Sequence, residues 1–228
     1  MVRRVGFSTL VFRSVFIGAL ATSLVTAANL PNPVAEEKGT QEKTEKVVLA
    51  GGCFWGVQAV FSATKGVSRA ISGYAGGSKG TAEYEIVSTG TTGHAESVEV
   101  TFDPAQISFG QLLKIYFSVA HDPTQLNRQG PDEGTQYRSE IFYTREEQKR
   151  VAEAYIQQLS AAKVFPKPIV TKVAPLQAFY PAEDYHQDYV LHCQQNLPVC
   201  RNKRYVDVFD IPKLASFHQE FPQFAKGK

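Results

Sequence analysis

The spacing of apolar and polar side chains predicts a series of short strands. Val98, Val100 and Phe102 alternate with Glu99 and Thr101, which is typical of a strand with one buried face. Short apolar runs bounded by glycine, proline or charged residues indicate further strands at residues 46–50, 69–74, 138–143 and 169–176.

Helical spacing appears between and after these strands. Val57, Val60 and Phe61 form one apolar face of a helix that starts at Cys53 or just after it. Capping boxes, in which Ser or Thr precedes Gln or Glu by three residues, mark two further helix starts. These boxes are Ser108 with Gln111 and Thr144 with Glu147, and shorter helices are expected at 182–192 and 213–221.

Interspersed strands and helices predict an α+β fold. We expect a single-domain two-layer α/β sandwich with a mixed or antiparallel sheet, a ferredoxin-like core and an irregular C-terminal tail. Residues 29–45 carry two prolines and mixed charge without apolar periodicity, so they are predicted to be a disordered linker. The folded domain is expected at 46–192 and the tail at 193–228.

The N-terminal 28 residues resemble a secretory signal. Arg3, Arg4 and Arg13 precede an uncharged apolar run at 15–25, and small residues follow up to Ala27. The run is too short to span a bilayer comfortably. We expect cleavage near Ala27 and a periplasmic or secreted protein, and an organelle transit peptide remains the alternative.

Composition narrows the function classes. The 228 residues are 43% hydrophobic and 20% charged, which suits one globular domain. The net charge of +2 becomes −1 when the three arginines of the leader are removed, so neither nucleic acid nor an anionic membrane is an expected partner. No Cys-x-x-Cys pair or other ligand spacing is present, so we expect no metal and no bound organic cofactor.

Three cysteines, Cys53, Cys193 and Cys200, are too few for a disulfide scaffold, and the odd count leaves one thiol unpaired or reactive. Cys53 stands in Gly-Gly-Cys-Phe-Trp-Gly, between a predicted strand and a predicted helix. Free N–H groups and the positive end of a helix dipole favour a thiolate there. Phe54 and Trp55 offer an apolar wall for a small substrate group. The alternative is that Cys53 is a small buried core residue.

The chain carries GGCFWG at 51–56 and six further short segments between residues 73 and 187, and in this order they resemble the A-type methionine sulfoxide reductases. GGCFWG resembles the nucleophile motif of that family. Six further segments follow in the order of the family, and the match covers residues 46–192, which we therefore take as the catalytic domain. The segments are GYAGG (73–77), TGHAE (92–96), HDPTQ (121–125), RQG (128–130), DEGTQYRS (132–139) and EDYHQ (183–187).

The resemblance implies reduction of methionine S-sulfoxide, free or within a protein. Cys53 would attack the sulfur, and Glu96 would be the acid that holds a proton near neutral pH. The resemblance also implies the remaining site residues. Tyr84 and Tyr137 would hold the sulfoxide oxygen, Phe54 and Trp55 the methyl group, Asp132 the polar end of the substrate, and His186 and Gly52 would line the site.

Turnover requires a second thiol, and here the sequence departs from the family. Family members often carry a resolving cysteine in a glycine-rich tail, whereas this tail lacks those glycines and continues for 28 residues after Cys200. We expect Cys200 to resolve the Cys53 sulfenic acid, with Cys193 a second resolver or a bystander, and a thioredoxin-type protein as reductant. A structural Cys193–Cys200 disulfide is the alternative.

Two other classes of protein remain open from the residues alone. A papain-like cysteine hydrolase would need His94, His121 or His186 as the base for Cys53. A secreted binding module would pair Cys193 with Cys200 and leave Cys53 inert. No amphipathic dimer helix stands out, so a monomer is expected.

Overall fold

The computed structural model describes residues 30–36 and 43–227. The predicted leader, residues 1–28, lies outside the described residues. In the described part of the chain, no helix is both long and apolar enough to cross a membrane.

Six strands form the main sheet, in the order β7-β6-β1-β3-β2-β8. All neighbours pair antiparallel except β6 and β7, which are parallel. The predicted mixed sheet is therefore confirmed. The strands are β1 (Glu45–Gly51), β2 (Val67–Ala75), β3 (Ala95–Phe102), β6 (Ser139–Tyr143), β7 (Lys172–Pro175) and β8 (Phe179–Pro181), and a separate hairpin joins β4 (Arg128–Gln129) to β5 (Asp132–Glu133).

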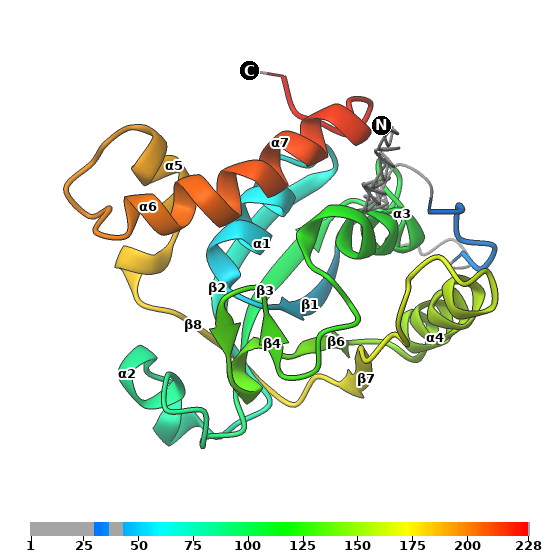
Figure 1. The fold of residues 1–228 in the computed structure, drawn as a ribbon. Helices are drawn as coiled ribbons and strands as arrows, with labels where there is room; N and C mark the ends of the chain where they lie inside the picture. The colour runs from blue at the N-terminus through cyan, green and yellow to red at the C-terminus, as the bar shows by residue number, and fades with distance from the viewer. Residues whose placement is uncertain (1–29, 37–42, 228) are drawn as a thin grey trace, which may run out of the picture.

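The helices lie between these strands and after them (Figure 1). The α-helices are α1 (Phe54–Ser62), α2 (Tyr84–Val87), α3 (Phe109–Ile115), α4 (Glu146–Ala161), α5 (Tyr189–Gln194), α6 (Lys203–Tyr205) and α7 (Ile211–Glu220). The short 3₁₀ or π turns are η2 (Lys79–Thr81), η3 (Tyr116–Ala120), η4 (Thr135–Tyr137), η5 (Asp184–His186) and η6 (Val206–Asp210).

The core of the domain is ferredoxin-like, as predicted. The chain runs β1-α1-β2-β3-α3-β6, and the corresponding strands lie side by side in the order β6-β1-β3-β2. Val47 and Leu49 of β1 enter the large core under the helices, whereas Val48 and Ala50 face a smaller cluster on the other side of the sheet. Because the pleat alternates side chains between faces, both faces of β1 are buried.

The two predicted capping boxes differ in outcome. Ser108 and Gln111 form the reciprocal hydrogen bonds of a capping box at the start of α3. The second box is wrong, because α4 starts one residue later than predicted, with Arg145 as its N-cap. The backbone N–H of Thr144 instead donates to Gln148 Oε1 at 3.0 Å.

The chain that follows β8 also differs in part from prediction. The helix expected at 182–192 is divided into the turn η5 and the helix α5. The expected irregular tail is wrong for residues 203–220, where α6, η6 and α7 form one helical run. This run contains all but the last residue of the predicted 213–221 helix, and α7 packs on α1 above the sheet (Figure 1).

The linker predicted at 29–45 is corrected in its described parts. Leu30 is buried in the main core, and β1 already begins at Glu45. Residues 31–36 lie against α3 and α4, where Tyr155 Oη donates to Pro31 O at 2.9 Å and Gln158 Nε2 donates to Asn32 O at 2.8 Å. One buried leucine and several main-chain hydrogen bonds are enough to hold this stretch, although its composition lacks any period.

Candidate active site

Cys53 lies at the junction of β1 and α1, where it is the N-cap of the helix. The preceding Gly52 has φ of +84°, in the left-handed region that disfavours side chains. A Cβ atom on Gly52 would lie 2.4 Å from Cγ of Gln129. The turn that presents Cys53 therefore requires glycine at position 52 on two grounds.

The Cys53 thiol is buried, and burial raises its pKa well above the ordinary value. The carboxyl groups of Glu96 and Asp210 raise the pKa further, whereas the Trp55 backbone N–H and Lys213 lower it. The helix start is expected to favour the thiolate over the thiol, and here two effects on the pKa of Cys53 oppose each other. The N–H group contributes as expected, but desolvation outweighs it.

Glu96 is the buried acid beside Cys53. It lies on β3, only 3% exposed, and Oε2 accepts the Phe54 N–H at 3.1 Å. Burial raises the pKa of Glu96 to about 8, and the charges of Asp132 and Asp210 add to the effect against the Phe54 hydrogen bond. Glu96 thus holds a proton at neutral pH, the state that the sequence resemblance implies.

A cavity of about 200 Å³ joins these two groups to most of the predicted site residues. Gly52, His186, Cys193 and Cys200, also predicted, are not part of its lining. The cavity is lined by Cys53, Phe54, Trp55, Tyr84, Glu96, Asp132, Tyr137, Asn202 and Tyr205.

Tyr84 and Tyr137 bring hydroxyl groups to this cavity. Burial raises the pKa of Tyr84 to about 12, and it also raises the pKa of Tyr137, with Glu96 adding to both. Both hydroxyls therefore stay protonated at neutral pH and can donate hydrogen bonds. Glu183 fixes the start of α2, because its Oε1 accepts the Tyr84 N–H at 2.8 Å.

Trp55 is held from two sides. Its Nε1–H donates to Nδ1 of His186 at 3.0 Å, and its ring stacks on Tyr189 with centroids 4.0 Å apart. Burial lowers the pKa of His186 to about 4, so the imidazole is neutral. Because Nδ1 accepts, Nε2 carries the proton. His186 therefore positions the indole ring of the cavity wall.

Three residues of the C-terminal segment reach the site without having been predicted. Tyr205 closes the cavity next to Trp55, and its hydroxyl donates a short hydrogen bond to Asp132 Oδ2. Asn202 also lines the cavity. Asp210 is fully buried at the start of α7, and its Oδ1 lies 3.7 Å from Lys213 Nζ. No local motif marks these positions, since contacts between distant residues bring them here, including the bond of Asn202 to Tyr189 and the packing of α7 on α1.

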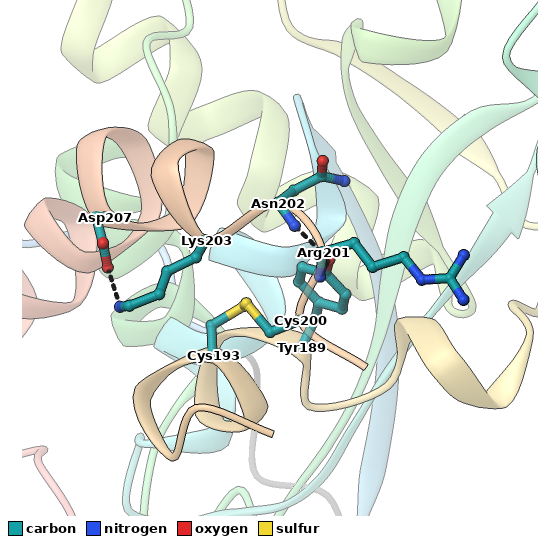
Figure 2. Close-up of a disulfide and its surroundings, with 7 residues drawn as sticks. All are labelled: Tyr189, Cys193, Cys200, Arg201, Asn202, Lys203 and Asp207. Carbon is teal, nitrogen blue, oxygen red and sulfur yellow. Dashed lines mark hydrogen bonds and ion pairs between the residues drawn. A yellow bond between two sulfur atoms is a disulfide. The ribbon is translucent and has the colours of Figure 1, made fainter. Parts of the chain in front are cut away.

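Cys193 and Cys200 form a disulfide, with Cα atoms 4.9 Å apart (Figure 2). Cys193 is fully buried on α5, and Cys200 is partly exposed in the loop that follows. The Tyr189 hydroxyl anchors this loop, since it accepts the N–H groups of Arg201 at 2.9 Å and Asn202 at 3.0 Å. Cys53 is left as the free cysteine.

The histidines give the hydrolase alternative no base. Nδ1 of His94 accepts the Gly77 N–H at 3.2 Å. His121 contacts Tyr116 O and Ser139 Oγ, and His186 is bonded to Trp55. Within residues 30–36 and 43–227, no group of three or more His, Cys, Asp or Glu side chains is arranged to hold a metal ion.

Comparisons with known proteins identify the family of this chain. Residues 45–214 match the family model described as "Peptide methionine sulfoxide reductase". The chain is 56% identical to peptide methionine sulfoxide reductase MsrA 2 of Mesorhizobium japonicum, with 81% of this chain and 91% of that protein covered. It is 52% identical to MsrA 2 of Synechocystis sp., with 87% and 91% covered.

A solved structure is similar as well. The crystal structure of Mxr1 from Saccharomyces cerevisiae in reduced form is 32% identical, with a TM-score of 0.62 over 72% of this chain and 94% of that one. This chain therefore belongs to the peptide methionine sulfoxide reductase family and is an oxidoreductase of its A type.

Proposed function

We propose that Cys53 reduces methionine S-sulfoxide, free or within a protein, by direct attack on the sulfoxide sulfur. The observation that carries the proposal is one small cavity that contains a thiol, a carboxylic acid protonated at neutral pH and an aromatic wall. The S-methyl group lies against Phe54 and Trp55. The oxygen faces the hydroxyl groups of Tyr84 and Tyr137 and the carboxyl group of Glu96.

The reactive form of the site has one proton fewer than the resting form. Since a thiol is a poor nucleophile, the Cys53–Glu96 pair reacts when its remaining proton is on Glu96 and Cys53 is a thiolate. The thiolate attacks the sulfur while Glu96 protonates the oxygen. The oxygen and its proton then pass to Cys53 as a sulfenic acid, and methionine leaves with two more electrons on its sulfur.

The tail cysteines then restore Cys53. The Cys200 thiol condenses with the sulfenic acid to give a Cys53–Cys200 disulfide and one water molecule. The Cys193 thiolate attacks Cys200 Sγ and releases the Cys53 thiolate. The product is the Cys193–Cys200 disulfide of this structure. An external dithiol of the thioredoxin type reduces it by attack on Cys200, since Cys193 is fully buried.

No bound metal or organic cofactor takes part in this scheme, because thiols carry both electrons throughout. We further propose that the protein acts as a monomer in a periplasmic or extracellular compartment. The support is the leader-like sequence at residues 1–28. An oxidising compartment would also place the Cys193–Cys200 pair where disulfides persist.

A stoichiometry experiment tests the proposal. Fully reduced protein is mixed with methionine S-sulfoxide without reductant, and methionine and free thiols are counted. We expect about two methionines per chain, the first with loss of two thiols and the second with oxidation of the released Cys53. Cys53→Ser should form none, and no methionine from the unmodified protein would overturn the proposal.

The resolving step has its own variants. Cys200→Ser should form about one methionine per chain and then fail to turn over with a thioredoxin-type reductant. If Cys200→Ser turns over normally while Cys193→Ser does not, the assigned order of the two cysteines is wrong.

A further inference from the structure

A second hollow opens directly beside the Cys53 cavity. Its volume is about 440 Å³, and it shares Trp55, Tyr84 and Asn202 with that cavity. We call it the outer groove, and define it by Tyr84, Tyr185, His186, Tyr189, Val199 and Arg201. Its size is within the range of sites that hold small organic groups.

Aromatic rings make up one side of the outer groove, and Glu85, Val199, Arg201 and Asn202 complete its lining. The His186 ring lies 4.4 Å from the Tyr84 ring and 4.2 Å from the Tyr185 ring, measured between centroids. Tyr189 continues this surface through its stack on Trp55. Tyr185 is 48% exposed although it is large and aromatic. Such a surface suits an aromatic or aliphatic side chain.

A buried donor belongs to the same wall. His186 is 2% exposed, and its Nε2 has no hydrogen-bond partner among the described residues. The nearest carboxylate oxygen, Glu183 Oε2, is 3.9 Å away, which is too far for a hydrogen bond. Because Nδ1 accepts from Trp55, Nε2 carries a proton and lacks an acceptor. Because Nε2 is itself buried, it is not available to a ligand in the groove as the structure stands.

The continuity of the two hollows indicates the occupant. A methionine sulfoxide side chain in the Cys53 cavity would emerge past Trp55, Tyr84 and Asn202, which both hollows share. The next part of the same polypeptide then enters the outer groove. We propose that the outer groove binds the residue adjacent to the oxidised methionine and selects an apolar, preferably aromatic, side chain there. This inference rests on the proposed reduction at Cys53.

Tyr185 is the residue through which the groove can be tested, because it is exposed and lies outside the Cys53 cavity. Protein oxidised to the Cys193–Cys200 disulfide retains free Cys53, so a single turnover reports on this state of the enzyme. The substrates are acetylated and amidated tripeptides with methionine S-sulfoxide at the centre. Phe or Ala stands on its N-terminal or C-terminal side, and free methionine S-sulfoxide is the reference.

Phe should exceed Ala about tenfold in the second-order rate constant on one of the two sides, the scale for burying an aromatic side chain. Tyr185→Ala should bring this Phe-to-Ala ratio close to one, and Tyr185→Phe should keep it near ten. Each ratio is taken relative to the rate of the same variant with the free amino acid. Equal rates for Phe and Ala on both sides, or an unchanged ratio in Tyr185→Ala, would overturn the inference. Failure of every sulfoxide, including the free amino acid, would instead contradict the proposed function.

Discussion

Proton placement dominates the chemistry at the scale of single residues. Cys53, Glu96 and Asp210 are all buried, and each carboxyl group raises the pKa of the thiol. Burial also raises the pKa of Asp210, to about 6, against the charge of Lys213. At neutral pH Cys53 and Glu96 therefore hold their protons while Asp210 is mostly ionised, and the Cys53–Glu96 pair must lose one proton to react.

The pH dependence of catalysis follows from the loss of this one proton. The Cys53–Glu96 pair loses its first proton near pH 8, because burial raises the pKa of Glu96 to about 8 and that of the thiol is higher still. We expect kcat/KM, which reports on the free enzyme, to rise between pH 6 and 8 and then to level off. A fall over the same interval, measured with methionine S-sulfoxide and excess dithiothreitol, would contradict this assignment.

The variant Glu96→Gln tests whether Glu96 acts as a proton donor or only fills the buried site. Glu96→Gln keeps the shape and an acceptor for the Phe54 N–H, but it cannot supply a proton. We expect kcat/KM to fall by about 10²-fold or more and the break near pH 8 to disappear. Glu99→Gln is the matched control on the same strand, since Glu99 pairs with Lys46 outside the cavity. Its activity should remain within about twofold of the unmodified protein, as is usual for a surface change.

Substitutions of Asp210 and Lys213 should shift the pKa of the Cys53 thiol in opposite directions. Asp210→Asn removes a charge that raises the pKa of Cys53, and Lys213→Met removes one that lowers it. In protein with the Cys193–Cys200 disulfide intact, iodoacetamide reports on Cys53. We expect alkylation at pH 8 to become about threefold faster in Asp210→Asn and about threefold slower in Lys213→Met, because the pKa of Cys53 falls in the first variant and rises in the second.

A surface lysine controls for this effect. Lys203 lies on the same helical run but is half-exposed and paired with Asp207. Alkylation of Lys203→Met should match the unmodified protein. Equal rates in all four proteins would show that the two buried charges do not reach the thiol.

At the scale of elements, the helical run from Lys203 to Glu220 completes the site. It brings Tyr205 to the cavity wall and Asp210 against α1. Gly56 of α1 allows this close approach, because a Cβ atom there would lie 2.3 Å from Asp210 Oδ1. The last segment of the chain is thus a structural part of the reductase and not an appendage.

The docking of α7 can be measured through one side chain. Phe217 is fully buried, so Phe217→Ala should lower the free energy of unfolding by about 3–5 kcal/mol in urea titration. Val208 belongs to the same helical run but is 53% exposed, and Val208→Ala should stay within about 0.5 kcal/mol. Similar losses in both variants would mean that α7 is not docked as described.

Local sequence predicted most elements of the sheet domain and misplaced those at its margins. β3 and α3 could be predicted from the sequence because apolar–polar alternation and a capping box are local signals. α4 starts after Arg145 because Thr144 is bonded to Gln148. The single helix expected over 182–192 is divided at Gln187, whose backbone is extended. The Gln187 side chain is hydrogen-bonded to Ser72 and to Gln58. Gln58 also accepts the backbone N–H of Asp188. Contacts between distant residues decide such boundaries.

At the scale of the whole molecule, both ends of the described chain are fastened to the domain. The N-terminal stretch 30–36 lies on α3 and α4, and the C-terminal helix lies on α1. If the leader is cleaved near Ala27, Leu30 remains in the mature protein. Its anchoring would then stabilise the exported form.

The N-terminal anchor offers a matched pair of variants. Leu30 is 4% exposed, and Val34, four residues later, is 81% exposed. We expect Leu30→Ala to lower the free energy of unfolding by about 2–4 kcal/mol and Val34→Ala by less than about 0.5 kcal/mol. Chemical denaturation of the protein beginning at residue 28 provides the measurement. No difference between the two variants would show that this stretch is not part of the core.

The amino-acid motifs were enough to indicate the family of this protein, and local patterns were enough to place most strands and helices of the sheet domain. The motifs around Cys53, Glu96, Tyr137 and Asp132 are short and ordered, so they indicate the family without coordinates. The coordinates were needed to find the raised pKa of Cys53, the bond of Asp132 to Tyr205, the bond of His186 to Trp55 and the outer groove. Each of these depends on burial or on contact between residues far apart in the chain, which no local pattern encodes.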